Sequence, residues 1–369
     1  MIFFKQKMKL CFFGAYDPRY PRHNIIKRGL VTNKVKVIEC RLSPKYKFWL
    51  RYPLFLFRYP LFCKNNDFIF VPEFCQKDMP LAKFLSWFSS ARLVFDPLAA
   101  RYETKITDWK RKSEDSWQAR WNFKIDRWAF KLSDLILADT QAHKEYYCQK
   151  YGLASDKVAV LPVGFDDSFF VPTKAKNRNR RFSVLFYGSF LPLHGVEVMI
   201  QAAKSVSFIE PSIQFKFVGS GQTLPRVQAL ATELNCSNVY FEDWIPQEKL
   251  PEKIASADLC LGIFGKTEKA KRVVPHKIFQ ALAMKSPVIT ARTPAVEEFF
   301  SHRENIFLCS EPFPDSLTKA VLELKEDEAL RKKIAENGLD LVRKSFAPAA
   351  IGRSLKRILE QYFSESSRR

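Results

Sequence analysis

The fold of this chain is decided by residues 182–204, which read FSVLFYGSFLPLHGVEVMIQAAK. The first seven residues are rich in aromatic and β-branched types, which is typical of a strand, and they end at Gly188. Gly195 follows at the start of a segment with helical periodicity over 195–206. A strand, a glycine turn and a helix form one βα unit. Backbone N–H groups at the start of such a helix can bind a phosphate.

The same alternation continues on both sides of this unit. Further strands are expected downstream at 213–219, 238–244, 257–265 and 286–291. Upstream strands are expected at 9–14, 35–39, 67–71, 92–96, 135–139 and 157–164. Because helical segments separate these strands, the sequence predicts an α/β protein with two doubly wound, Rossmann-like parallel sheets.

A polar segment separates the two sets of strands. Residues 171–181 read VPTKAKNRNRR, lack periodicity and are interpreted as a linker. The 369 residues exceed the roughly 250 to 300 at which single cores stop growing. We therefore expect domains over 1–165 and 166–346. A ligand cleft is expected at the carboxyl ends of the strands, where the domains face each other.

Positive charge is concentrated at the start of the chain. The sequence has 60 Lys and Arg against 39 Asp and Glu, a net charge of +21. Residues 1–62 hold 14 of the basic residues but only two acids, Asp17 and Glu39. Such a field attracts nucleic acid, anionic lipid or phosphorylated sugars without distinguishing them. A content of 47% hydrophobic residues excludes a disordered basic protein.

Cysteine usage and the N-terminus bear on the compartment. Eight cysteines form no CxxC pair and five histidines no HxxxH or HExxH motif, so a reduced cytosolic chain without structural zinc is favoured. The N-terminal MIFFKQKMKLCFFGAYDP carries charges through its apolar stretch and is a poor secretory signal. No run of about 18 apolar residues occurs, so no spanning helix is expected.

The C-terminal half resembles the retaining GT-B glycosyltransferases of family 4. The similarity lies in VLFYGSFLPLHGVEVMIQAAK (184–204), FKFVGSGQTLPRV (215–227), NVYFEDWIPQEKLPEKIASADLCLGIFG (238–265) and RVVPHKIFQALAMKSPVITARTPAVEEFF (272–300). FFGAYDPRYPRHNIIKRGL (12–30) and FDPLAARYET (95–104) are similar to a subset of the family more loosely. The resemblance implies a GT-B fold with an acceptor-binding N-terminal domain and a nucleotide-sugar-binding C-terminal domain. It also implies that a last helix within 347–369 packs on the N-terminal domain.

The resemblance places the donor diphosphate at the loop that starts at Gly188. The family usually has cations in this loop, where this chain has Ser189 and His194. Positive charge then has to come from the basic residues that follow the strand at 257–265, and such cations would stabilise the leaving diphosphate. An ordinary solvated loop is the alternative. The basic residues are Lys266, Lys269, Lys271 and Arg272.

A second departure lies in the helix after Pro275. The family often has two glutamates eight positions apart, the second of which bonds the ribose, whereas this chain has Arg272 and Gln280. An amide can still bond a ribose hydroxyl, but a guanidinium cannot replace a carboxylate, which leaves the donor sugar open. The alternative is an exposed helix face at Lys277 and Gln280. Family members usually hold the nucleobase where this chain has Trp244 and Ile245, although a core aromatic would look the same. The predicted donor-binding residues are Gly188, Ser189, His194, Gly195, Trp244, Ile245, Lys266, Lys271, Arg272, Lys277 and Gln280.

Candidate acceptor and catalytic residues follow strand ends in the first half. Arg19 and Arg22 are expected to face the cleft and to hold an anionic acceptor, unless they form the basic rim of a loop. Asp96 and Tyr102 are the candidate catalytic residues, although the histidine that many family members carry here is missing. The chain has no strict DxD triplet, so neither metal nor cofactor is expected beyond the nucleoside-diphosphate sugar, which acts as co-substrate. The predicted acceptor-binding residues are Gly14, Asp17, Arg19 and Arg22.

The segment KYKFWLRYPLFLFRYPLF (45–62) repeats RYPLF and has four basic residues, no acid and eight aromatic residues. Aromatic rings with interleaved cations suit the headgroup boundary of an anionic membrane. A buried edge of the core would explain the aromatic residues but not the charges. We predict a peripheral position on the inner face of the cytoplasmic membrane and a lipid-linked acceptor in cell-surface polysaccharide or lipopolysaccharide synthesis. The predicted membrane contacts are Trp49, Arg51, Phe55 and Arg58.

Three other classes remain open. The lost glutamate and cation positions allow a catalytically inactive GT-B scaffold that recruits partners. The charge allows a nucleic-acid-binding protein, but that class predicts RNP-like motifs, a helix-turn-helix or Cys/His fingers, and none is seen. Another enzyme of this fold, such as an epimerase, is the third. A retaining glycosyltransferase without a nucleic-acid partner is the leading interpretation.

Overall fold

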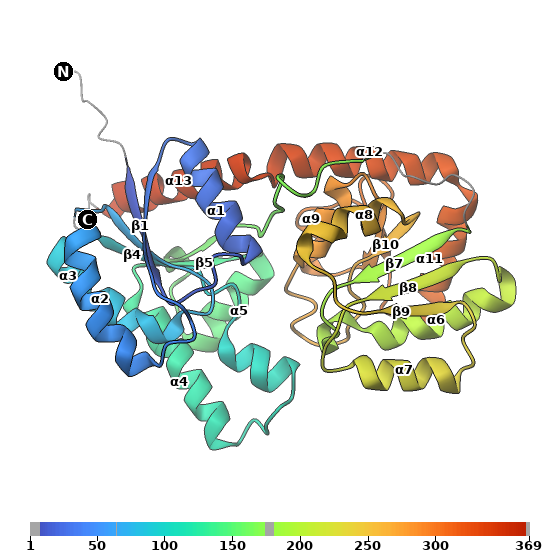
Figure 1. The fold of residues 1–369 in the computed structure, drawn as a ribbon, viewed down its shortest axis with the longest axis horizontal. Helices are drawn as coiled ribbons and strands as arrows, with labels where there is room; N and C mark the ends of the chain where they lie inside the picture. Colours follow the sequence, from blue (N-terminus) through green and yellow to red (C-terminus); the bar gives the residue numbers. More distant parts are fainter. Residues whose placement is uncertain (1–7, 64, 174–180, 367–369) are drawn as a thin grey trace. The chain divides into compact units, whose positions relative to one another are not determined.

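The computed structural model describes residues 8–63, 65–173 and 181–366. The chain forms two compact units, each with a six-stranded parallel sheet (Figure 1). Unit 1 comprises the described residues up to Pro162 and those from Ala347 onward, and unit 2 runs from Val163 to Phe346. The expected α/β architecture with two doubly wound sheets is confirmed. Residues 174–180 of the expected linker lie outside the described residues.

The sheet of unit 1 has the strand order β2-β1-β3-β4-β5-β6. Strand β1 pairs with β2 on one side and with β3 on the other, so the winding reverses next to β1. Such a switch point is where doubly wound sheets bind ligands. The strands are β1 (Lys9–Gly14), β2 (Lys36–Arg41), β3 (Phe68–Val71), β4 (Arg92–Phe95), β5 (Leu135–Ala138) and β6 (Val158–Val160).

Helices cover both faces of this sheet. Helices α2 to α5 lie on one face, and α1 and α13 lie on the other (Figure 1). This is the arrangement that right-handed crossovers give to a sheet of this order. The helices are α1 (Pro21–Thr32), α2 (Phe48–Phe62), α3 (Met79–Ser89), α4 (Trp117–Leu132), α5 (Gln141–Tyr151) and α13 (Pro348–Ser366).

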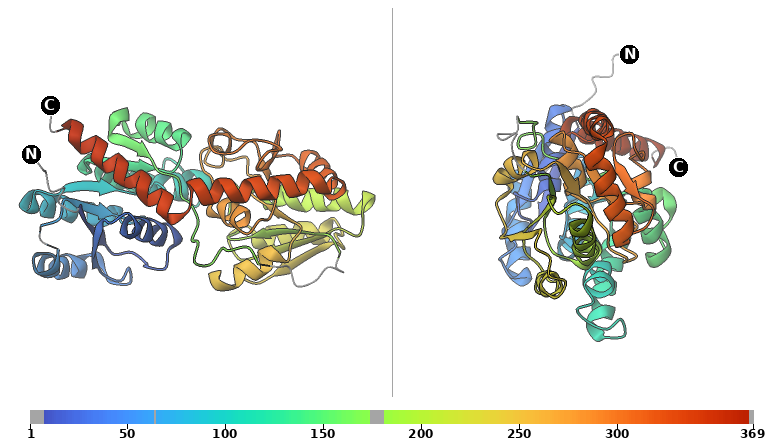
Figure 2. Two further views of the ribbon diagram at one scale, coloured as in Figure 1. Left: turned by 90° about the horizontal axis from the view of Figure 1, so that it is seen from above. Right: turned by 90° about the vertical axis from the view of Figure 1, so that its right-hand side faces the viewer.

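Helices α1 and α13 meet through two glycines. A Cβ on Gly29 would lie 2.0 Å from the carbonyl oxygen of Pro348, and one on Gly352 would lie 2.0 Å from the carbonyl carbon of Gly29. Only glycine allows the two backbones to approach this closely. The side-chain amide of Asn33 donates a hydrogen bond to the carbonyl oxygen of Ala349 at 2.9 Å. Residues after 347 therefore complete the N-terminal unit (Figures 1 and 2).

The sheet of unit 2 has the order β12-β11-β10-β7-β8-β9, with β7 between β10 and β8. Its strands are β7 (Ser183–Tyr187), β8 (Gln214–Val218), β9 (Val239–Glu242), β10 (Leu259–Leu261), β11 (Val288–Ala291) and β12 (Phe307–Cys309). Its helices are α6 (Val196–Ile209), α7 (Leu224–Glu233), α8 (Leu250–Ala255), α9 (His276–Ala283), α10 (Pro294–Glu297), α11 (Pro314–Glu326) and α12 (Glu328–Ser345). The switch point next to β7 brings the expected phosphate-binding unit, β7 with α6, to the middle of the sheet.

Two features concern possible environments of the chain. No helix within the described ranges has the length and apolar character needed to cross a bilayer. Across the same ranges, no group of three or more His, Cys, Asp and Glu side chains is arranged to hold a metal ion.

Candidate functional site

Two glycine loops meet at the carboxyl ends of β7 and β8. Gly188 and Gly219 have φ values of +129° and +140°, which L side chains rarely adopt. A Cβ on Gly219 would lie 2.0 Å from the carbonyl oxygen of Gly188. The N–H of Phe190 donates to the carbonyl oxygen of Ser220 at 2.9 Å. Close backbone contact therefore fixes the loop between β7 and α6.

The loop after β10 supports the start of α6. Gly195, with φ of +62°, precedes the helix, and a Cβ there would lie 2.2 Å from the carbonyl carbon of Phe264. The N–H of Phe264 donates to the carbonyl oxygen of His194 at 2.9 Å. The helix start and the basic segment that begins at Lys266 therefore lie on neighbouring loops.

The side chain of His194 is directed into the protein and contacts the loop between β7 and α6. Its side chain is buried, and Nδ1 donates a hydrogen bond to the carbonyl oxygen of Ser189. Burial, and secondarily the positive charge of Lys277, lower the pKa of His194 well below its usual value, so the ring is neutral at pH 7. His194 thus helps to position the loop, and its direct contact with the donor stays a prediction.

A buried lysine from α9 lies under the same loop. Lys277 is only 7% exposed, and its Nζ has no hydrogen-bond partner among the described residues. Nζ lies 3.8 Å from the centre of the Phe186 ring and would be 3.2 Å from a Cβ on Gly188. Burial lowers the pKa of Lys277 well below its usual value. Gln280 is also buried, so the alternative of an exposed helix face at these two residues is wrong.

The remaining predicted donor-binding residues are more accessible. Lys266 is exposed, with its amine 4.0 Å from the centre of the Phe313 ring. Lys271 is exposed and forms an ion pair with Glu268 at 2.7 Å. Trp244, which follows β9, is 64% exposed, so the core alternative for this ring is wrong. Ser189 is exposed, whereas Ile245 and Arg272 are half-buried.

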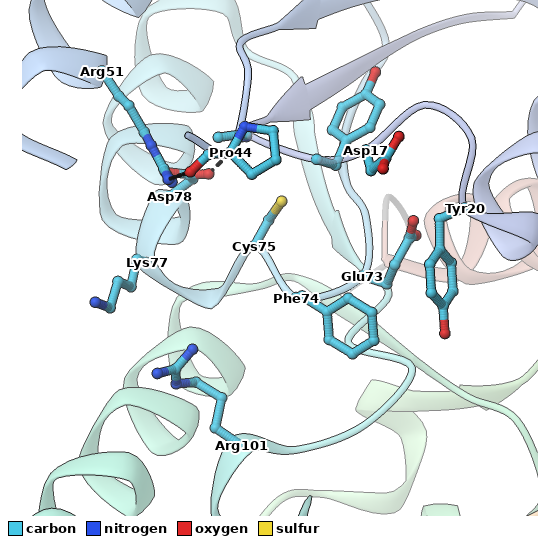
Figure 3. Close-up of a pocket in the computed structure, with 12 residues that line it drawn as sticks. Asp17, Tyr20, Pro44, Arg51, Glu73, Phe74, Cys75, Lys77, Asp78 and Arg101 are labelled. Atoms are coloured by element: carbon cyan, nitrogen blue, oxygen red, sulfur yellow. Dashed lines mark hydrogen bonds and ion pairs between the residues drawn. The ribbon is translucent and has the colours of Figure 1, made fainter. Parts of the chain in front are cut away.

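Unit 1 has a cavity of about 320 Å³ at the carboxyl ends of β1 and β3 (Figure 3). Of the predicted acceptor residues, Asp17 lines it. A Cβ on Gly14 would lie 3.0 Å from Sγ of Cys75, so a glycine at this position allows Cys75 of the cavity wall to pack closely against β1. Arg19 forms an ion pair with Asp17 at 3.0 Å on the surface. The charged residues that line the cavity are Asp17, Arg51, Glu73, Lys77, Asp78 and Arg101.

Arg22 and Asp96 form a fully buried ion pair, with 2.6 Å between Nε and Oδ2. The Arg22 guanidinium also donates to the carbonyl oxygens of Leu161 and Pro162, each at 3.0 Å. The Arg22 guanidinium is therefore committed to internal contacts, and the prediction that it holds an acceptor is wrong in this structure. Oδ1 of Asp96 is buried without a hydrogen-bond partner among the described residues, and its contact with the reacting sugar stays a prediction.

Tyr102 is also an internal residue. Its backbone N–H donates to the carboxylate of Asp126 at 2.7 Å. Its buried ring packs against Phe123, with 5.7 Å between ring centres, and it does not line the cavity. The structure thus gives Tyr102 a packing role, and its catalytic role stays a prediction.

Glu73 is one of the cavity residues that were not predicted from the sequence, together with Lys77, Asp78 and Arg101. It lines the cavity but is only 2% exposed, and neither carboxyl oxygen has a hydrogen-bond partner among the described residues. Burial, and then the charge of Asp96, raise the pKa of Glu73 to about 8. The sequence feature that could have indicated Glu73 is its position just after the strand FIFV, in a half of the chain that is poor in acidic residues.

Helix α2 presents an apolar outer face. Phe55 and Tyr59 are buried and lie 4.5 and 6.1 Å from the ring of Phe13 in β1. Phe55 is fully buried, so its predicted membrane contact is wrong. Arg51 donates to the carbonyl oxygens of Tyr46 and Pro44, and Arg58 is exposed. The exposed apolar residues of this helix are Trp49, Leu50, Leu54, Leu56, Phe57 and Leu61.

Helices α3 and α4 lie on the same face of the sheet as α2 (Figure 1) and also carry exposed apolar residues. Phe84, Trp87 and Phe88 are exposed on α3 at positions i, i+3 and i+4. On α4, three exposed tryptophans are interspersed with four exposed cations. These residues are Trp117, Trp121 and Trp128 with Arg120, Lys124, Arg127 and Lys131. The exposed residues of α2, α3 and α4 are called the aromatic surface below.

Comparisons with known proteins support the fold and the family. The family profile described as "Glycosyl transferases group 1" matches residues 169–340. The D-inositol 3-phosphate glycosyltransferase of Thermomonospora curvata is 25% identical over 254 residues, covering 61% of this chain and 56% of that protein. The lipopolysaccharide core biosynthesis glycosyltransferase LpsE of Rhizobium meliloti is 22% identical over 169 residues, covering 46% of each protein. The chain spans about half the length of the curated relatives it matches.

Similarity to a solved structure extends over nearly the whole chain. The crystal structure of Anabaena HepE in complex with UDP and glucose matches with a TM-score of 0.72 at 17% identity. The match covers 96% of this chain and 100% of HepE. The resemblance found in the sequence is thus confirmed: residues 169–340 match the family profile of the group 1 glycosyl transferases, and the chain has the GT-B fold.

Proposed function

We propose that this protein is a retaining glycosyltransferase that moves a sugar from a nucleoside-diphosphate donor to a lipid-linked glycan acceptor. In this proposal unit 2 binds the donor and unit 1 the acceptor. The observation that carries it is the Lys277 amine, which is buried without a hydrogen-bond partner under a loop bounded by two glycines. A buried amine without a partner is costly, and a diphosphate would supply the missing acceptor oxygens.

The donor site would combine backbone and side-chain groups. The first turn of α6 would offer N–H groups to the phosphates. The loop would add N–H groups at positions other than Phe190 and His194, whose N–H groups already donate to carbonyl oxygens. Lys277 would lie behind the diphosphate, with Lys266, Lys271 and Arg272 around it. Gln280 would bond the ribose, and Trp244 with Ile245 would contact the base. UDP is the first nucleotide to test, because HepE was crystallised with it.

Transfer would occur with retention at the anomeric carbon. The acceptor hydroxyl oxygen forms the new bond on the face from which the diphosphate leaves, and the diphosphate departs with the bonding electron pair. The hydroxyl proton then passes to the departing phosphate oxygen. The protein contributes positioning and charge-assisted hydrogen bonds to the leaving group instead of a covalent nucleophile.

The aromatic surface supports a position on the inner face of the cytoplasmic membrane. Exposed tryptophans and phenylalanines with neighbouring cations suit the headgroup region of an anionic leaflet. Trp117, Trp121 and Trp128 with the α4 cations form such a pattern, and Trp49, Arg58 and Phe57 extend it on α2. A lipid-linked acceptor for cell-surface polysaccharide or lipopolysaccharide would be reached from there.

Donor turnover tests the enzymatic part of the proposal. The chain is incubated with a panel of nucleotide sugars and with lipid-linked acceptors extracted from membranes. Release of the nucleoside diphosphate and a product that keeps the anomeric configuration, measured by NMR, are expected. Nucleotide binding without turnover would instead indicate an inactive scaffold. RNA binding with a steep salt dependence and no nucleotide binding would indicate a nucleic-acid-binding protein.

Vesicle flotation tests the membrane part. Wild-type protein should float with vesicles that contain phosphatidylglycerol and much less with neutral vesicles. The variant Trp87→Ser/Phe88→Ser should lose flotation. Phe208→Ser is the matched control, because Phe208 is a similarly exposed aromatic residue in unit 2. Equal flotation of all three proteins would contradict this part.

A further inference from the structure

One side of the cavity of unit 1 is basic and is formed by Arg51, Lys77 and Arg101. Arg51 already donates to two carbonyl oxygens and lies 3.7 Å from the Asp78 carboxylate. Lys77 and Arg101 lie next to each other on the basic side (Figure 3), and neither forms an ion pair with a described carboxylate. Lys77 is exposed, while Arg101 is half-buried and donates from Nε to Asn122 at 3.2 Å.

These cations repel one another. Desolvation, and then the charges of Arg101 and Arg51, lower the pKa of Lys77. Burial also lowers the pKa of Arg101. Asp78 lies beside Arg51, and the charge of Asp126 acts on Arg101, but neither carboxylate forms an ion pair with Lys77 or Arg101. Three positive groups around one cavity favour an anionic ligand. A phosphate ester is suited to a lysine beside an arginine, since its oxygens accept several charge-assisted hydrogen bonds.

The opposite side of the cavity has the unpartnered Glu73 carboxyl. Figure 3 shows Glu73 beside Tyr20 and Asp17, separated by Phe74 from Lys77 and Arg101. A carboxyl that is buried and neutral offers an O–H donor and a carbonyl acceptor, which together fit a sugar hydroxyl. Among the described residues that line the cavity, the Glu73 side has no positive charge to stabilise a phosphate, whereas the basic side has Lys77 and Arg101. The phosphate of a ligand would therefore lie on the basic side and a hydroxyl group on the Glu73 side.

We propose that this cavity binds a phosphate ester that carries a free hydroxyl, with the phosphate between Lys77 and Arg101 and the hydroxyl on Glu73. The inference rests on the proposed function, in which this ligand would be the acceptor. The volume of about 320 Å³ lies at the lower end of ligand pockets, which span about 300–1,000 Å³, and suits one phosphorylated ring. The ester can belong to a soluble sugar phosphate or to a polyprenyl phosphate sugar.

Calorimetric titration of the full chain with glucose 6-phosphate, glucose and inorganic phosphate tests the proposal. Binding of glucose 6-phosphate but not of glucose is expected. Lys77→Gln/Arg101→Gln should weaken it by about ten-fold or more, because charge-assisted bonds are lost. Lys36→Gln/Lys112→Gln removes the same charge from exposed positions outside the cavity and should leave binding unchanged. Equal affinity in both variants would overturn the proposal.

Glu73→Leu tests the other end of the ligand. This variant should lose the preference for glucose 6-phosphate over inorganic phosphate, whereas Glu73→Gln, which still forms hydrogen bonds, should keep it. A preference that survives Glu73→Leu would overturn the role of Glu73. Melting temperatures of all variants show whether a loss of binding reflects unfolding.

A flotation experiment with lipid vesicles distinguishes a lipid-linked phosphate ester from a soluble sugar phosphate. Flotation is compared on phosphatidylcholine vesicles that contain either a polyprenyl phosphate or the unphosphorylated polyprenol. A phosphate-dependent difference that Lys77→Gln/Arg101→Gln abolishes indicates a lipid-linked ester, and an effect on soluble ligands alone indicates a sugar phosphate. UDP binding is measured on the same samples. Intact UDP binding without binding of either phosphate ester refutes this inference and leaves the proposed function standing, whereas loss of UDP binding refutes the latter.

Discussion

Replacing Lys277 by Met should make unit 2 more stable and its nucleotide binding weaker. Met has a similar length and fills the space of the lysine stem with a flexible apolar chain. The wild-type amine is buried without a hydrogen-bond partner among the described residues, and such a group costs about 1–3 kcal/mol. For a unit of this size each kcal/mol corresponds to about 2–4 °C, so the melting temperature should rise by about 2–12 °C.

The binding effect has the opposite sign. A charge-assisted hydrogen bond to the diphosphate contributes about 1.5–3 kcal/mol, so Lys277→Met should raise the Kd for UDP by about 10- to 150-fold. Scanning calorimetry measures the first effect and isothermal titration the second. Lys319→Met on α11 is the control, because Lys319 is exposed and its loss should change stability by no more than about 0.5 kcal/mol.

Protonation gives an independent signature of Lys277. Burial lowers its pKa in the folded state, so the unfolded chain binds more protons between that pKa and the ordinary value of 10.5. The free energy of unfolding should therefore rise with pH over this window, and this rise should be absent in Lys277→Met. UDP should also protonate the amine, which titrations in two buffers of different ionisation enthalpy would detect. A lower melting temperature with unchanged UDP affinity would refute the reasoning.

Two further predictions concern unit 1. Phe55→Ala should cost about 3–5 kcal/mol in urea unfolding, because the ring is fully buried, whereas Phe57→Ala on the exposed face should stay within about 0.5 kcal/mol; similar losses would contradict the assignment of the two faces. Buried His143 lies 3.0 Å from Glu103 and 2.5 Å from Asp139. Burial lowers the pKa of His143, but the two carboxylates raise it by more, so its pKa is about 9. Its folded pKa lies above the ordinary 6.5, so its stabilising contribution is complete below pH 6.5 and is lost as the pH rises through about 9. Unfolding measured across this range should show a decline that His143→Gln reduces, and parallel curves would argue against the charged histidine.

The sheets could be predicted because their signals are local. Each strand is a short apolar run followed by a turn, and residues 182–204 contain a complete unit of this kind. The right-handedness of the crossover connections restricts the orders in which such strands can pair in a sheet. Local composition therefore fixed the order of the elements along the chain, and chirality restricted how they assemble.

The misassigned side chains depend on distant contacts. Arg22 belongs to a basic loop in the sequence, but its carbonyl partners are 139 and 140 residues away. Helix α2 is apolar on both faces, so periodicity could not show that Phe55 points inward and Phe57 outward. Glu73 is an ordinary acid by sequence, and its burial becomes visible only once β3 lies beside β1.

The contact between Gly29 and Gly352 has a consequence for the order of folding during synthesis. All of unit 2 lies between these two glycines in the sequence, so it leaves the ribosome before the partner of α1 has been made. Unit 2 can fold as soon as it emerges, whereas the apolar side of α1 stays uncovered until α13 appears. The half of the chain that is translated first is therefore the half that is completed last.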